Sequence, residues 1–268
     1  MTKKNSTSAS WWNQSHIEQH HGKLWRIGTL SLLVRCLPNE WQIAYSRKNE
    51  SESDLFKWNV SDSDQTPENF KEQARYVFHE TSGLVSFSPL LADRPMICRP
   101  RTPFNLTAGE EITLYVSTPL WLEISVGKTQ KKLTEIPIHR PSDTWFGPTT
   151  REGELCYASN TAARLILEEL PQRPHRAVTP VLIRNLADSV LSIERLNVPA
   201  PLLPLVQDAD GQMWTPKVTL TREKDGDMAG LKIDTKAPKE ASEAKVLRKP
   251  RIKTSSGALI RAFNAVFG

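Results

Sequence analysis

Three histidines near the N-terminus are the residues best spaced for metal chemistry. His16 and His20 are four residues apart, so on a helix they would share one face, and His21 follows directly. A metalloprotease helix carries Glu immediately after its first histidine, because that Glu activates the metal-bound water. Ile17 occupies that position here. We therefore expect no metal site and a plain polar N-terminal helix.

Asp208-Ala209-Asp210-Gly211 imitates the start of a calcium-binding loop. Such a loop needs glycine at its sixth position and a bidentate glutamate at its twelfth. In this chain Gly211 comes too early, and Thr219 stands at the twelfth position. The stretch therefore predicts a hairpin turn rather than a cation site.

Acid–base and nucleophilic chemistry have candidates between residues 139 and 157. Glu152 and Glu154 would share one face of a strand, as paired catalytic carboxylates can, but a solvated pair is far commoner. Cys156, beside Tyr157 on an apolar strand, indicates a core thiol rather than a nucleophile. Ser142 lies near a histidine and an aspartate but lacks a nucleophile elbow. We expect no catalytic residue and no cofactor.

The composition is that of a globular protein. Of 268 residues, 38% are hydrophobic and 24% charged, and the three cysteines form no CxxC pair that could hold zinc. The N-terminus has no apolar run typical of a secretory signal. The longest weakly charged run, residues 112–126, is shorter than the roughly 20 residues that span a bilayer. The expected location is the cytoplasm, with attachment to a membrane surface left open.

The positive charge is concentrated at the C-terminus. Residues 236–268 hold eight basic and two acidic side chains, whereas the other 235 residues hold 27 basic and 28 acidic ones. The net charge of +5 therefore belongs to the tail, and the body is close to neutral. Residues 236–254 lack the aromatic side chains on which bases stack, so nucleic acid is not an expected partner.

Strand patterns fill the region between the two ends. Leu30, Leu32 and Val34 alternate with other residues before a turn at 38–40, which predicts a hairpin running into residues 41–45. A second hairpin is predicted from 218–220 to 231–233. Short strands at this spacing favour a mainly β, β-sandwich-like fold, either one large domain or two closely packed β-halves. The expected parts are a flexible segment (1–22), a first β-half (23–141), a second β-half (142–235), a basic linker (236–254) and an amphipathic docking helix (255–268).

The tail combines charge with an apolar stripe, which predicts a binding segment. Its apolar residues fall on one helical face, and an isolated helix of this length must dock on something to persist. The candidate partner-binding residues are Lys245, Arg248, Lys249, Arg251, Lys253, Leu259, Ile260, Phe263, Val266 and Phe267.

The stretch DTWFGPTTREGELCYAS, residues 143–159, is interpreted as a structural joint between the two halves. In this interpretation Trp145 and Phe146 fill the seam, and Gly147-Pro148 redirects the chain.

Residues of this stretch also occur in a known protein family. The chain resembles a family of archaeal and bacterial proteins of unknown function over about residues 24–235, through the segments 92–95, 115–121, 143–148, 153–158, 180–185, 193–199 and 213–215. The resemblance brings no activity and no catalytic residues. Some members of that family are encoded beside small-conductance mechanosensitive channels, which implies a channel accessory protein.

Two functions stay open at this point. The first is a non-enzymatic accessory or regulatory protein that binds a protein partner or a membrane surface through the basic tail and terminal helix. Docking of the helix on the protein itself or in a homo-oligomer is its alternative. The second function is a hydrolase or carbohydrate-processing enzyme built on Trp145, Glu152, Glu154 and Tyr157.

Overall fold

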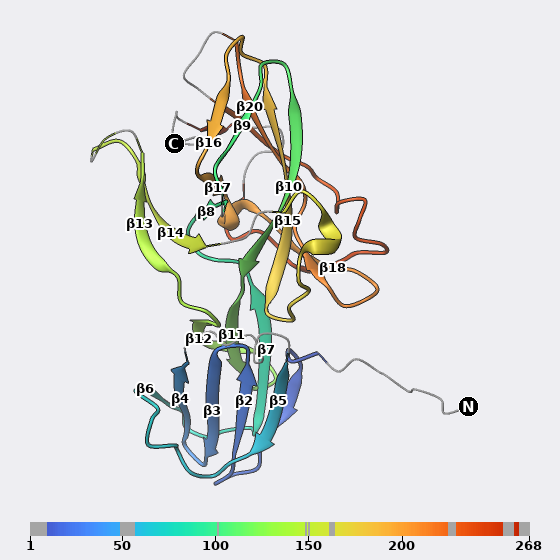
Figure 1. Ribbon diagram of the computed structural model, residues 1–268. Helices are drawn as coiled ribbons and strands as arrows, with labels where there is room; N and C mark the ends of the chain where they lie inside the picture. The colour runs from blue at the N-terminus through green and yellow to red at the C-terminus, as the bar shows by residue number, and fades with distance from the viewer. Residues whose placement is uncertain are drawn as a thin grey trace. The chain divides into compact units, whose positions relative to one another are not determined.

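The structure, a computed structural model, describes residues 10–48, 57–100, 102–147, 149, 151–160, 164–224, 229–253 and 260–262 (Figure 1). Strands dominate these residues, which confirms the mainly β fold. The helical segments described are two single 3₁₀ turns, η1 (Leu167–Glu169) and η2 (Ala200–Leu202).

The chain divides into two compact units. Unit 1 comprises Met1–Leu90, Trp121–His139 and Arg173–His175, and unit 2 comprises Leu91–Leu120, Arg140–Gln172 and Arg176–Gly268. This grouping differs from the predicted halves at 23–141 and 142–235, because each unit takes segments from both. Strand pairing between residues far apart in sequence decides the grouping, and local patterns do not report it.

Unit 1 contains a five-stranded antiparallel sheet in the order β5-β2-β3-β4-β6. The predicted first hairpin is confirmed, because Leu30 to Leu37 pair in register with Arg47 to Glu40. One face packs on Phe70 through Leu24, Leu33 and Ala44. The strands are β2 (Gly22–Ile27), β3 (Leu30–Leu37), β4 (Glu40–Arg47), β5 (Trp58–Asp62) and β6 (Glu72–Val77).

A second sheet of unit 1 has the order β1-β7-β11-β12. Its strands are β1 (Gln14–His16), β7 (Leu84–Leu90), β11 (Trp121–Val126) and β12 (Lys131–Pro137). Phe87 of this sheet meets Trp25 of the first, with ring centroids 4.5 Å apart in an edge-to-face arrangement. Two sheets joined through buried aromatic side chains give unit 1 the layering of a β-sandwich.

The N-terminal segment is anchored from residue 10 onwards, which differs from the flexible segment expected over 1–22. Trp11 is buried, and its indole Nε1–H donates to the carbonyl of Pro174 at 2.7 Å. Ile17 is also buried, and β1 pairs with β7. Two buried side chains six positions apart, in a stretch that is otherwise polar except for Trp12, have no periodicity that a sequence pattern could reveal.

Unit 2 is built on β15 (Arg176–Asn185), which pairs antiparallel with β10 (Glu111–Pro119) and parallel with two other strands. The large sheet has the order β22-β18-β19-β15-β20-β21-β23, with β10 joined to β15. The remaining strands are β18 (Leu205–Gln207), β19 (Met213–Trp214), β20 (Val218–Arg222), β21 (Ala229–Ile233), β22 (Lys245–Arg248) and β23 (Ile260–Ala262). The predicted second hairpin is confirmed by the pairing of β20 with β21.

Two smaller sheets complete unit 2. One has the order β13-β14-β8-β17, and the other pairs β16 with β9. Their strands are β8 (Met96–Arg99), β9 (Phe104–Leu106), β13 (Ser142–Phe146), β14 (Glu154–Asn160), β16 (Leu191–Ile193) and β17 (Leu196–Val198).

The C-terminal region departs from the predicted linker and helix. Residues 236–253 lie along unit 2, where β22 pairs antiparallel with β18, instead of forming a free linker. Most of the predicted helix at 255–268 is outside the described residues. Its described part, Ile260–Ala262, is a strand paired with β21. A hydrogen-bonded neighbour strand, invisible to a local helical pattern, determines the conformation of these three residues.

Gly28 supports the turn between β2 and β3. Its φ is 54°, and a Cβ added there would lie 2.7 Å from Cε1 of the buried His175 ring. We expect Gly28→Ala to lower the free energy of unfolding by about 3 kcal/mol, through backbone strain together with overpacking. Equilibrium urea unfolding would measure the loss.

Gly127→Ala is the matched control within unit 1. Gly127 has φ 76°, but its added Cβ would meet only Ser82 Oγ, at an ordinary 3.7 Å. The control should lower the free energy of unfolding only by the backbone strain, about 1–2 kcal/mol. Equal losses in the two variants would contradict the packing of Gly28 against His175.

Candidate binding surfaces

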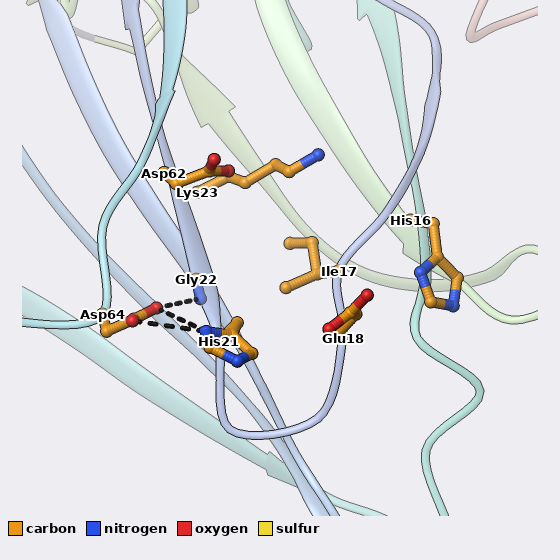
Figure 2. A pocket seen from close by; sticks show the side chains of 8 residues that line it. All are labelled: His16, Ile17, Glu18, His21, Gly22, Lys23, Asp62 and Asp64. Carbon is orange, nitrogen blue, oxygen red and sulfur yellow. Dashed lines mark hydrogen bonds and ion pairs between the residues drawn. The ribbon is translucent and has the colours of Figure 1, made fainter.

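An open polar groove lies in unit 1 beside β1, β2 and β5. Its volume is about 370 Å³, and it is lined by His16, Ile17, Glu18, His21, Gly22, Lys23, Asp62 and Asp64 (Figure 2). His21 Nδ1 lies 3.2 Å from both carboxylate oxygens of Asp64. The same carboxylate accepts the Gly22 N–H at 3.0 Å. Asp64 therefore fixes one end of the groove, and Figure 2 shows Lys23, Glu18 and His16 around the open space.

The polar N-terminal helix expected around His16 and His20 is wrong, and the groove does not bring these two histidines together. His16 ends a strand, and His20 sits in a turn with φ 71°, so the helical face that would bring them together does not form. Within the described ranges, no group of three or more His, Cys, Asp and Glu side chains is placed to hold a metal ion. Side chains of both charge signs line the groove, which makes it a polar surface hollow rather than a cation cage.

The aspartates at 208–211 also have a structural role. Asp208 Oδ1 accepts the backbone N–H of Asp210 at 3.0 Å and of Gln212 at 2.8 Å. Its other oxygen accepts the indole N–H of Trp214 at 2.7 Å. The loop joins β18 to β19, which are paired antiparallel, so the predicted hairpin turn is confirmed.

The sheet that contains β13 and β14 separates the two aromatics of the predicted joint. Phe146 is buried with Ile97 and Cys156. Trp145 points the other way and is 44% exposed, because neighbouring residues of a strand face opposite sides. The indole of Trp145 therefore does not fill a core, whereas the ring of Phe146 does.

Cys156 is a core thiol, as predicted. Its side chain is fully buried, and burial raises the pKa of its thiol to about 12, with the Glu154 carboxylate adding to the effect. At neutral pH the group is protonated and inaccessible, so it cannot act as a nucleophile.

The carboxylates near β14 do not converge as an acid–base pair. Glu154 is exposed and accepts a hydrogen bond from Asn197 Nδ2 at 3.1 Å. Glu152 lies before the strand, in the turn where its N–H donates to Thr149 Oγ1. Tyr157 donates its hydroxyl to Asp93, and its pKa is raised by partial burial and by that bond. These groups lie on an exposed surface and are already engaged with neighbours, an arrangement that does not favour the enzymatic alternative.

A third surface, the basic edge, follows β22 and the residues after it. We define it by Lys245, Arg248, Lys249, Arg251 and Lys253, the five described cationic candidates of the tail. The three lysines are exposed, whereas both arginines are half-buried. Arg251 donates Nε–H to the carbonyl of Leu91 at 2.9 Å and so anchors the segment.

Apolar side chains accompany these lysines. Val246 is 65% exposed and Ile252 is 54% exposed. β22 is the last strand on its side of the large sheet. The surface therefore offers positive charge and exposed apolar groups together, at the edge of a sheet.

Contacts upstream hold the basic edge in place. Ala241 is buried in a cluster with Val206 and Trp214. Tyr115 donates its hydroxyl to Glu240 at 2.8 Å. Partial burial is the larger cause, and this hydrogen bond the second, of a rise in the pKa of Tyr115 to about 12. The segment is thus packed against the large sheet before the lysines begin.

The remaining tail candidates fall on residues that are not described. Leu259, Phe263, Val266 and Phe267 lie outside the described residues, and only the backbone of Ile260 is described, within β23. Sequence reasoning found the cations of the basic edge, but it missed Val246 and Ile252 as exposed apolar neighbours. Their alternation with lysines and arginines in 245–253 was the available signal.

A family profile described as "Protein of unknown function (DUF432)" matches residues 11–267. The chain belongs to this family. The match confirms the resemblance found in the sequence and extends it through the groove and the basic edge. No curated protein and no solved structure matches the chain. Within the described residues, no helix is long and apolar enough to cross a membrane.

Replacing the two aromatics of β13 separately would test their assignment. Phe146→Ala should lower the free energy of unfolding by about 3–5 kcal/mol, because it empties a packed site. Trp145→Ala should cost about 1 kcal/mol, since it removes an exposed ring and one hydrogen bond. Urea unfolding of both variants would compare them. A larger loss in the free energy of unfolding for Trp145→Ala than for Phe146→Ala would support the earlier interpretation, in which the Trp145 indole fills a seam between the two halves.

Proposed function

We propose that this protein is a non-catalytic accessory protein that docks through its basic edge onto an anionic membrane surface. The observation that carries the proposal is that Lys245, Lys249 and Lys253 are exposed on a segment that is paired and anchored on unit 2, and that Val246 and Ile252 of the same segment are exposed as well. Lysines attract acidic headgroups, and neighbouring apolar side chains can insert at the interface.

The charge distribution supports this choice of partner. The body of the chain is close to neutral, so a diffuse electrostatic attraction from the whole molecule is weak. The cations gather instead on one strand and the residues that follow it. Because this strand is paired within the sheet, little additional backbone entropy is lost when its lysines bind.

The partner implied by the family resemblance is consistent with binding to a membrane surface. A mechanosensitive channel lies in a membrane, so an accessory protein that binds acidic headgroups would be concentrated beside it. In this proposal the basic edge supplies the attraction to the membrane, and recognition of a channel is a separate contact.

Removing the three lysine charges would test the role of the basic edge. The variant Lys245→Gln/Lys249→Gln/Lys253→Gln should bind vesicles containing phosphatidylserine about a hundredfold more weakly. Each basic residue near such a surface contributes about 1 kcal/mol, so three contribute about 3 kcal/mol. Co-sedimentation with vesicles across a lipid series would measure the change.

A matched control separates position from net charge. Lys57, Lys71 and Lys128 are exposed lysines of unit 1, so their replacement by Gln removes the same charge elsewhere. This control should bind nearly as well as the natural chain. Equal weakening in both triple variants, or no binding of the natural chain to acidic vesicles, would overturn the proposal.

A further inference from the structure

The outer strand of the β13–β14 sheet exposes an aromatic–aliphatic pair. β13 is the last strand in the order β13-β14-β8-β17, and no described residue pairs with its outer edge (Figure 1). Trp145 lies directly across from Leu155 of β14, and these side chains are 44% and 45% exposed. An unpaired edge beside exposed apolar groups is a template for a further strand.

The Trp145 ring is held in place before any partner arrives. Its Nε1–H donates to the carbonyl of Thr149 at 2.8 Å, within the turn that follows β13. Gly153 passes so close that an added Cβ would lie 2.8 Å from the same Nε1. A rigid exposed tryptophan loses little entropy on binding, which is the property of an interface hot spot.

The neighbouring pair along the strand is polar and already balanced in charge. Asp143 lies across from Tyr157, and Arg94 donates to the Asp143 carboxylate at 3.0 Å. The Arg94 guanidinium also lies over the Tyr157 ring, 5.2 Å from its centroid. The only charged residue of β13 is therefore neutralised within its own chain, and it offers little repulsion to an approaching strand.

We propose that β13 pairs antiparallel with β13 of a second copy of this chain, about a two-fold axis at Thr144. In this register each Asp143 lies opposite Trp145 of the other copy, and the two Thr144 residues face each other. One row across the joined sheets then reads Leu155 and Trp145 from one copy, followed by Asp143 and Tyr157 from the other. The symmetry repeats this row in the opposite direction, so the surface is self-complementary.

A second copy is favoured over an unrelated strand, because each chain carries both the exposed tryptophan and the polar group that would face it. A tryptophan ring attracts cations to its face, and the Arg94–Tyr157 stack stands beside the Asp143 that faces Trp145 in this register. A parallel arrangement would place Asp143 against Asp143 and leave each tryptophan without that stack. The antiparallel contact also closes on itself, which limits assembly to a dimer. This inference is independent of the basic edge.

Sedimentation velocity of the full chain over a concentration series tests the association. The natural chain should reach the mass of two 30.3 kDa chains. Trp145→Glu should remain at the mass of one, because it loses the apolar contact and places an unpaired carboxylate in the centre of the interface. Val77→Glu is the matched control, since Val77 is 78% exposed on β6 of unit 1, and it should still dimerise. A monomeric natural chain, or a dimeric Trp145→Glu variant, would overturn the proposal.

Disulfide trapping tests the register and does not depend on the stability of the Trp145 variant. Thr144 lies across from Cys156, so the trap uses Thr144→Cys in a Cys156→Ala background. Cys36 and Cys98 are buried and should not react. Mild oxidation should link two copies through residue 144, because residues facing each other across antiparallel strands lie about 5 Å apart.

Ser142→Cys in the same background is the control for the trap. In the proposed register Ser142 faces Phe146 of the other copy, so two residues 142 lie roughly 13 Å apart along the strands. Residue 142 should therefore give no linked dimer. Trapping at 142 and not at 144, or at neither position, would overturn the register. Binding of a foreign peptide by a natural chain that stays monomeric would assign the edge to another partner.

Discussion

The burial of β15 is the constraint on which unit 2 depends. Nine of its ten residues are buried, and it pairs with β10 on one side and with β19 and β20 on the other. Its ends carry buried polar side chains whose bonds fix the neighbouring segments. Asn185 Nδ2 donates to the carbonyls of residues 106, 107 and 189, and Arg176 donates to the hydroxyl and carbonyl of Ser117. Shifting β15 by one residue would disrupt both sets of bonds together with the packing.

The position of the basic edge follows from this central strand. β19 pairs with β15, β18 pairs with β19, and β22 pairs with β18, so the C-terminal cations are carried by a continuous ladder. A free linker would distribute its charge over many conformations. The pairing of β22 holds Lys245 and Val246 on the sheet, with Lys249 directly after the strand, so these exposed residues belong to a folded segment rather than to a free chain.

Local sequence patterns predicted those parts of the fold whose partners are near in sequence. The hairpin at 30–47 follows from alternation and a turn, as does the hairpin of β20 and β21. Pairing over long distances was not predictable in this way. The apolar stripe of the tail satisfied a helical period, yet Ile260–Ala262 pair with β21, because a neighbouring strand offers hydrogen bonds that a local pattern does not show.

The candidate sites also differ in how far the local sequence could predict them. The sequence identified the lysines of the basic edge, because a cluster of charge is visible in composition alone. It placed Trp145 and Phe146 together in a seam, whereas β13 sends them to opposite faces. The groove at Asp64 could not be predicted, since it joins residues more than forty positions apart.

Hydrogen–deuterium exchange of residues 245–248 tests the central claim, that the basic segment is a strand of the folded sheet. Backbone amides that donate within a strand pair exchange slowly, whereas those of a free linker exchange almost at once. The account predicts protection in peptides that cover β22, comparable with that of β18. Complete exchange of β22 at the earliest time point, with β18 still protected, would contradict it.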